Sequence, residues 1–123
     1  MPSFIELLRA VETREATRPR ITWYDDSPGP TQGERIELSG RVIVNWANKA
    51  ANALQEEFDV GPGIRVGLDL PPHWRTAYWA LATWATGATV VLGPHGALDD
   101  TDVLVTSEAQ TAAGHPAAIL VAL

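Results

Sequence analysis

The segment from Asp59 to Leu92 constrains the fold of this chain more than any other. It contains the tripeptide Gly61-Pro62-Gly63, alternating apolar residues, an uncharged stretch and a second apolar run that ends at Leu92. Pro62 fixes φ, and glycine adopts backbone angles that other residues resist. The pattern predicts a tight turn, a buried strand, a crossover helix and a second buried strand. Such a right-handed βαβ unit is the seed of a parallel sheet.

The residues before this segment predict a helix and a strand pair. Ser3 and Glu6 form a capping box, and apolar residues recur at helical spacing, which favours a helix over residues 3–15. Alternating residues at 20–24 and 35–38 flank a loop rich in Pro and Gly. Two short strands in an antiparallel pair fit this pattern best.

A long amphipathic helix and two more strands complete the expected elements. Ser39 is a good N-cap for a helix that ends near Asp59. Apolar runs at 102–106 and 117–123 predict two further parallel strands, with a short helix or loop over 107–114. We therefore expect one α/β domain over residues 1–123: a three-layer, mostly parallel sheet flanked by helices, with a short antiparallel strand pair near the N-terminus. Because the chain stops within an apolar run, we also expect a truncated domain.

Composition excludes several classes of function. The chain has no cysteine, which excludes disulfides, thiolate metal sites and cysteine nucleophiles. The net charge of −6 argues against nucleic-acid binding, which depends on neutralising phosphates. Glu6 and Arg9 interrupt the N-terminal apolar stretch, so it is no secretory signal, and the uncharged helix is too short for a bilayer. We expect a cytoplasmic protein with no nucleic-acid or membrane partner.

The order of these elements resembles one family. The matching residues are Ile36-Glu-Leu-Ser39, Trp46-Ala-Asn-Lys-Ala-Ala-Asn-Ala-Leu54, Val60-Gly-Pro-Gly-Ile-Arg-Val-Gly-Leu-Asp-Leu-Pro71, Trp84-Ala-Thr-Gly-Ala-Thr-Val-Val-Leu92 and Asp102-Val-Leu-Val-Thr-Ser107. They are similar to the N-terminal part of the adenylate-forming (AMP-binding) enzymes, which include acyl-CoA synthetases, nonribosomal-peptide adenylation domains and luciferases.

The resemblance implies an acid-activating ligase that uses ATP, Mg and coenzyme A, with a Ser/Thr/Gly-rich phosphate loop ending in Gly-x-Pro-Lys. This chain has no such loop, and Lys49, its only lysine, lies on the polar face of the second helix. Thr106-Ser107, Thr111 and Gly114-His-Pro116 echo the loop, but Ala117 stands where the lysine would be. We therefore expect no catalytic residue, no cofactor for this chain and no activity from it alone.

Three positions are the weak candidates for cofactor binding. Asp69 interrupts an apolar strand near its carboxyl end, the edge where open α/β sheets bind ligands. The alternative is that Asp69 accepts hydrogen bonds from the amides that open the next helix. Gly93 and Gly96 follow the second strand and could cradle an anion, although a lone Gly-x-x-Gly is a weak motif.

Other candidate chemistry has less support. His73, His95 and His115 with Asp99, Asp100 and Asp102 have no ligand-pair spacing, so we expect no metal site. Ser107 and His115 have no partner acid for a hydrolase triad. Of the aromatic residues, Tyr78-Trp79 is the best guess for an exposed contact.

Three functions stay open. The first is an acyl-CoA synthetase-like N-terminal domain, inactive without further sequence. The second is a stand-alone, non-catalytic binding or self-association module, and the third, with weaker support, is a small Rossmann-like nucleotide binder. A severed parallel sheet leaves an open edge, so the expected partner is a second copy, as a homo-oligomer such as a dimer, or the remainder of a longer chain.

Overall fold

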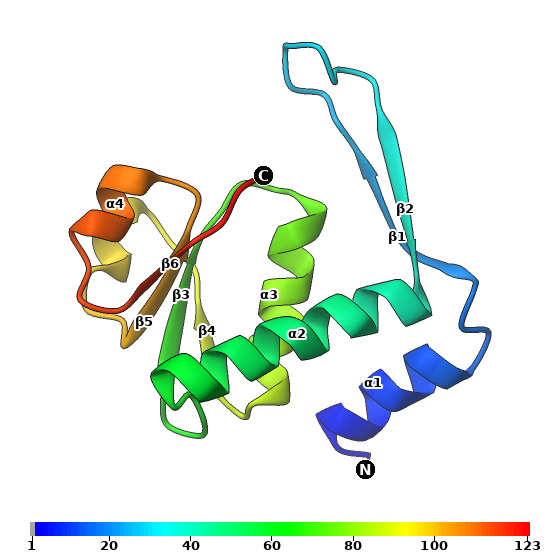
Figure 1. Cartoon of the computed structure of the whole chain (residues 1–123), viewed down its shortest axis with the longest axis horizontal. Coiled ribbons are helices and arrows are strands. Elements are labelled where there is room, and N and C mark those ends of the chain that lie inside the picture. Colours follow the sequence, from blue (N-terminus) through cyan, green and yellow to red (C-terminus); the bar gives the residue numbers. More distant parts are fainter. Residues whose placement is uncertain (1) are drawn as a thin grey trace. The chain divides into compact units, whose positions relative to one another are not determined.

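The computed structural model describes residues 2–123, with the side chain of His95 outside the described part. The chain divides into two compact units, of which one ends at Trp46 and the other spans Ala47–Leu123. Figure 1 labels the helices and strands along the chain. Each unit is described by itself. The expectation of a single domain over residues 1–123 stays a prediction.

The first unit contains helix α1 (Phe4–Thr13), strands β1 (Pro19–Tyr24) and β2 (Arg35–Ser39), and the first turns of α2 (Gly40–Phe58). The predicted capping box is present: the Glu6 amide donates to the Ser3 hydroxyl at 3.2 Å, and the Ser3 amide donates to the Glu6 carboxylate at 3.0 Å. The strands pair antiparallel, with Trp23 opposite Ile36. The predicted helix and strand pair are confirmed.

The close approach of α1 to the first residue of α2 depends on a glycine. A Cβ added at Gly40 would overlap the carbonyl oxygen of Val11. The Ser39 hydroxyl accepts from the Val42 amide at 3.2 Å, as expected of an N-cap. The end of α1 can therefore lie close to the start of α2, because Gly40 has no side chain. Ser39, the last residue of β2, caps the helix that follows.

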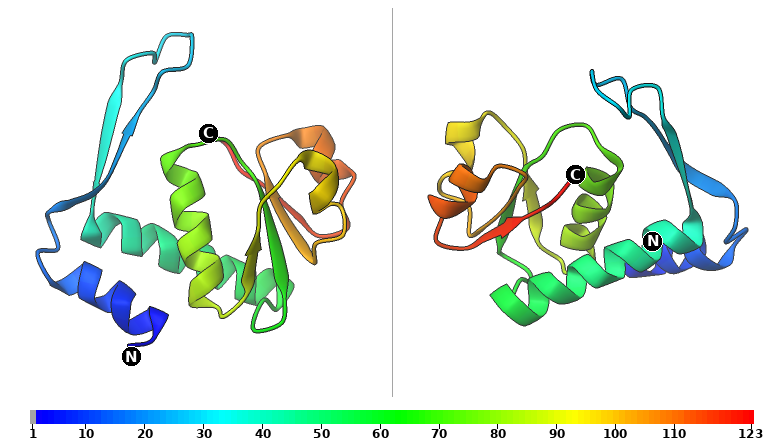
Figure 2. Two further views of the ribbon diagram at one scale, coloured as in Figure 1. Left: turned by 180° about the vertical axis from the view of Figure 1, so that it is seen from behind. Right: turned by 45° about the horizontal axis from the view of Figure 1, so that its top comes forward.

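The second unit is built on a parallel sheet with the strand order β4-β3-β5-β6. Its strands are β3 (Arg65–Asp69), β4 (Thr89–Val91), β5 (Val103–Thr106) and β6 (Ala118–Leu120). Helix α3 (Trp74–Ala85) covers one face of the sheet, and the 3₁₀ turn η1 (His95–Leu98) and helix α4 (Ala109–Ala113) lie over the other (Figures 1 and 2). The predicted α/β fold is confirmed.

The turn that leads into β3 follows the sequence prediction. The Ile64 amide donates to the Gly61 carbonyl at 3.1 Å, and Gly63 has φ +88°. Pro62 at the second position and a positive φ at the third define a type II turn. The strand that follows is buried at Val66 and Leu68, and both side chains belong to the core of this unit.

Within residues 2–123, no helix is both long enough and apolar enough to cross a bilayer. The cytoplasmic location remains a prediction.

Candidate functional site

The carboxyl edge of the parallel sheet brings two of the predicted positions to the same level. Gly67 pairs with Val91, and Asp69 pairs with Thr106. Asp69, the last residue of β3, and Gly93, which follows β4, therefore lie at the same edge. The chain leaves β3 toward one side of the sheet and leaves β5 toward the other, since α3 and α4 lie on opposite faces. The end of β3 and β5 is therefore a topological switch point, where open α/β sheets bind ligands.

Asp69 joins the two strands at this edge. The hydroxyl of Thr106 donates to the Asp69 carboxylate at 2.7 Å, and the same hydroxyl accepts from the Glu108 amide at 3.1 Å. Thr106 is fully buried and Asp69 is half-buried. The carboxylate thus ties the end of β3 to the end of β5 and to the turn that enters α4. Sequence reasoning missed this partner, which lies in a distant strand.

A histidine caps the opening of α3. His73 is the N-cap, and its Nδ1 accepts from the Arg75 amide at 3.1 Å. The hydroxyl of Thr76 donates to the Pro71 carbonyl at 2.7 Å. His73 therefore has a structural role at the start of α3. The alternative that Asp69 accepts hydrogen bonds from the amides at this helix opening stays a prediction.

Gly93 and Gly96 have different environments. Gly93 has φ +156°, and a Cβ there would come within 3.4 Å of Ala97 Cβ, so the turn after β4 favours glycine. Gly96 lies within η1, and a Cβ there would meet no atom within 4 Å. Only Gly93 follows its strand at the level of Asp69. The role of all three as cofactor contacts stays a prediction.

The residues that echo a phosphate loop form other structure. Thr106 is the last residue of β5, residues 109–113 form α4, and Gly114 ends that helix with φ −86°. The Thr106 hydroxyl donates to Asp69 of β3, and the Ala117 amide donates to the Nδ1 of His115 within the segment. A strand end, a short helix and a turn therefore stand where an open loop would be needed.

His115 is held by both of its ring nitrogens. Nδ1 accepts from the Ala117 amide at 3.0 Å, so Nε2 donates to the Thr101 carbonyl at 2.9 Å. Among the described residues, no group of three or more His, Cys, Asp or Glu could hold a metal ion. His95 contributes nothing to this assessment, because its side chain lies outside the described part.

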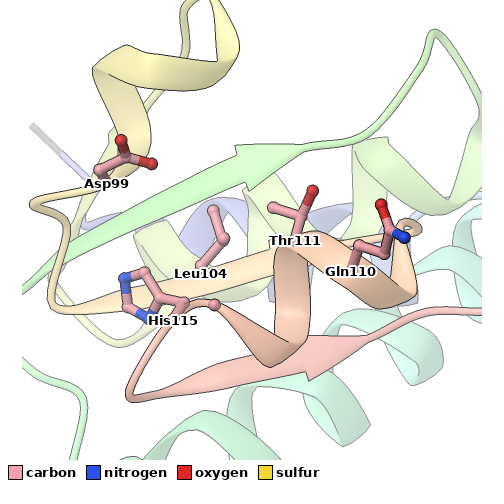
Figure 3. A pocket seen from close by; sticks show the side chains of 6 residues that line it. Asp99, Leu104, Gln110, Thr111 and His115 are labelled. Carbon is pink, nitrogen blue, oxygen red and sulfur yellow. The ribbon is translucent and has the colours of Figure 1, made fainter.

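A cavity of about 200 Å³ lies on the η1 and α4 face of the sheet. In Figure 3, Leu104 comes from β5, Gln110 and Thr111 come from α4, and Asp99 and His115 come from the connections that flank β5 and α4. Sequence reasoning considered Asp99 as a metal ligand, and His115 as a metal ligand, as a hydrolase residue and as part of the phosphate-loop echo. The cavity was missed because its lining comes from four separate segments.

The predicted exposed contact at Tyr78-Trp79 is wrong. Both side chains are buried, at 5% and 6% exposure, because they share the inward face of α3 with Ala82 and Thr83. Trp84, which points outward from the same helix, is 47% exposed. A pattern with three tryptophans spaced five residues apart did not indicate which of them is buried.

The sequence of the chain was compared with family models and with curated proteins. No family model matches the chain. A Mycobacterium tuberculosis protein that bears only a family designation is 47% identical over 74 residues, which is 60% of this chain and 29% of that protein. The nonribosomal peptide synthetase pngA of Aspergillus terreus is 38% identical over 81 residues, which is 66% of this chain and 8% of that protein. The chain thus spans less than a third of each relative.

Solved structures agree on the fold. The fatty acyl-adenylate ligase of L. pneumophila, solved with acyl adenylate and pyrophosphate, has a TM-score of 0.75 at 15% identity over 96% of this chain and 23% of that one. The NpsA N-terminal subdomain of Klebsiella oxytoca, solved with 3-hydroxybenzoyl-AMSN, has a TM-score of 0.71 at 14% identity over 98% and 30%. The chain therefore has the fold of the N-terminal domains of adenylate-forming ligases, as the sequence resemblance indicated.

Proposed function

We propose that this chain is the N-terminal scaffold of an acyl-CoA synthetase-like, adenylate-forming ligase and that it does not activate a carboxylate by itself. The observation that carries the proposal is the fold match over 96% of this chain to 23% of a fatty acyl-adenylate ligase. The partial sequence identity with a nonribosomal peptide synthetase supports the same class. In this role the chain forms part of the N-terminal domain of a larger enzyme.

The chemistry of phosphate binding supports the proposed lack of activity. A phosphate loop needs converging backbone amides and a cation. The only lysine of the chain is Lys49, which is exposed on α2. The segment after β5, which most resembles the loop, forms α4 instead, and its Thr106 hydroxyl is buried against Asp69. These residues offer no cradle for the three phosphates of ATP.

The test compares this chain with the full product of its gene. The reading frame beyond codon 123 is sequenced from the transcript, and both forms are assayed for ATP–pyrophosphate exchange with a panel of carboxylic acids. We expect the longer product to carry a Gly-rich loop ending in Lys and to exchange pyrophosphate, and residues 1–123 to be silent. Exchange by residues 1–123 alone would overturn the claim of inactivity.

A second candidate is a stand-alone module that associates with itself. It is favoured by the exposed leucines at the two outer strands of the sheet: Leu92 follows β4 and is 69% exposed, and Leu120 ends β6 and is 56% exposed. Outer strands with unpaired backbone groups and apolar side chains favour pairing with another copy. A reading frame that ends at Leu123 would favour this candidate over the first.

Light scattering at increasing protein concentration tests self-association. The module predicts a dimer mass that falls to the monomer mass in Leu120→Lys, because a charge on an outer strand opposes pairing. The exposed Ala122→Lys, which adds the same charge outside β6, is the control. A monomer mass at all concentrations would contradict this candidate.

A further inference from the structure

Four arginines surround the first turn of α2. The Gly40 amide donates to the Arg18 carbonyl at 3.2 Å, and the Arg41 amide donates to the Ala16 carbonyl at 3.0 Å. The segment between α1 and β1 therefore lies against the start of α2 (Figure 1). We call the four exposed arginines of this region the basic corner: Arg14, Arg18, Arg20 and Arg41.

The positive charge of the basic corner is mostly not neutralised. Within residues 2–123, its only ion pair joins Arg18 to Glu15 at 2.8 Å. The Arg20 guanidinium donates to the backbone carbonyl of Arg14 at 3.2 Å. Four arginines and one glutamate leave a local charge of +3 in a chain whose net charge is −6. Guanidinium groups match the geometry of carboxylates, so this surface suits an acidic partner.

The other end of α2 carries the opposite charge. Three exposed carboxylates, which we call the acidic end, lie in or directly after its last turn: Glu56, Glu57 and Asp59. Among the described residues, none of these carboxylates has an ion pair. The last turn of α2 also contains no basic residue. The acidic end therefore has no cation of its own to balance it.

Both groups of charges oppose the dipole of α2. A helix favours negative groups at its N-terminus and positive groups at its C-terminus. The first turn of α2 contains Arg41 and no acidic residue, and the last turn contains two glutamates and no basic residue. At about 1.5 Å per residue, the ends of this 19-residue helix lie about 28 Å apart, so they cannot neutralise each other within one copy.

We propose that the basic corner is a docking surface for the acidic end of a second copy. The guanidinium groups receive the carboxylates, and the two helix ends that meet have opposite partial charges. Every copy carries both surfaces, so each can provide one and receive the other. This inference goes beyond the proposed function and depends on neither of its candidates, because the contact involves no outer strand of the sheet.

The association should be weak and should decrease with salt. An exposed ion pair changes an equilibrium constant by at most about fivefold, and the net charge of −6 on each copy opposes the approach. NMR diffusion at up to about 1 mM protein measures the average mass, since affinities of this order are expected from a few such pairs. We expect association at about 0.1 M ionic strength and its loss at about 1 M, where the Debye length is only about 3 Å.

Two charge reversals and their mixture give the sharpest test. Arg41→Glu alters the basic corner, and Glu57→Arg alters the acidic end. Each variant alone should associate at least about fivefold less tightly than the natural chain. An equal mixture should recover association, because opposite charges then meet again in both directions. Both changes agree with the dipole of α2, so neither should lower Tm, and the loss of association cannot be attributed to unfolding.

Three controls separate this contact from other causes. Arg9→Glu and Glu34→Arg change the net charge by the same amounts at exposed positions outside both surfaces, so they should associate as the natural chain does. Leu120→Lys, which opposes pairing of outer strands, should also leave this association unchanged. A monomer at about 0.1 M ionic strength, association that persists at about 1 M, equal losses in the controls or a mixture that stays monomeric would each overturn the proposal.

Discussion

Gly67 shows how one missing side chain allows two neighbouring segments to pack on β3. A Cβ at this position would lie 3.0 Å from Thr101 Oγ1, 3.1 Å from Thr101 Cγ2 and 3.2 Å from Leu104 Cδ1. Thr101 is 5% exposed and its hydroxyl is already bonded to Leu98, so it cannot easily move aside. A glycine inside a strand often marks such a close approach.

We expect Gly67→Ala to lower the free energy of unfolding by about 1 to 3 kcal/mol through overpacking. Urea denaturation measures the change. Gly61→Ala is the matched control, because a Cβ there meets nothing within 4 Å, and it should change stability little. If the two variants were equally stable, the close packing around Gly67 would not limit the stability of the sheet.

Thr106 supplies the second prediction at the residue scale. Thr106→Val keeps the shape of the side chain but leaves the Asp69 carboxylate without its hydroxyl donor. We expect a loss of about 1 to 3 kcal/mol in the free energy of unfolding, because a half-buried charged acceptor loses a partner. Urea denaturation again measures it.

Thr83→Val is the control for this substitution. Thr83 is also fully buried, but its hydroxyl donates to the Trp79 carbonyl within α3, so no charged group loses a partner. The Thr106 variant should therefore be the less stable of the two. The reverse order would mean that the Asp69–Thr106 hydrogen bond contributes little.

At the scale of elements, the loop between β1 and β2 is organised by one aspartate. Asp25 is 6% exposed, and its carboxylate accepts from the Ser27 amide at 2.9 Å and from the Thr31 hydroxyl at 2.5 Å. Its own amide and carbonyl pair with Glu34 and Gly33. A Pro/Gly-rich segment that the sequence indicated only as a loop therefore has an ordered set of hydrogen bonds.

Asp25→Ala should loosen this loop. The hydrogen bonds to Ser27 and Thr31 disappear, and at about 0.5 to 1.5 kcal/mol each their loss should lower the protection of the loop amides by about 1 to 3 kcal/mol. Hydrogen exchange at the Gly33 and Glu34 amides measures the change. Asp26→Ala removes an exposed neighbour and should leave both amides as protected as before; equal deprotection in both variants would count against the role of Asp25.

The elements could be predicted from sequence where their causes are local. The Ser3–Glu6 capping box, the Ser39 cap and the Gly61–Gly63 turn each depend on residues within three positions of one another. The partner of Asp69 lies 37 residues away, and the cavity draws on separate segments. Local pattern cannot identify such neighbours, because strand order and register decide them. The burial of Tyr78 and Trp79 was missed for a similar reason.

At the scale of the whole molecule, the proposed function predicts that this chain does not bind nucleotides by itself. A ligand at a hundred times its dissociation constant adds about 2.7 kcal/mol to stability, which raises Tm by several degrees in a domain of this size. We expect ATP, AMP and coenzyme A at millimolar concentration to leave Tm unchanged. A clear rise with any of them would revive the third hypothesis, a Rossmann-like binder that uses Asp69 and Gly93.

The pairing of β3 with β5 has a consequence for synthesis. An aspartate side chain accepts a hydrogen bond between the two strands at each end of this pair. The Arg65 amide donates to Asp102 at one end, and the Thr106 hydroxyl donates to Asp69 at the other, and each pair of residues is 37 positions apart in the sequence. During translation at about 5 to 20 residues per second, β3 leaves the ribosome about 2 to 7 s before its partner is complete. Throughout that interval Val66 and Leu68 belong to a strand whose inner edge is open. The nascent chain is therefore open to wrong pairing at this edge until residue 106 emerges.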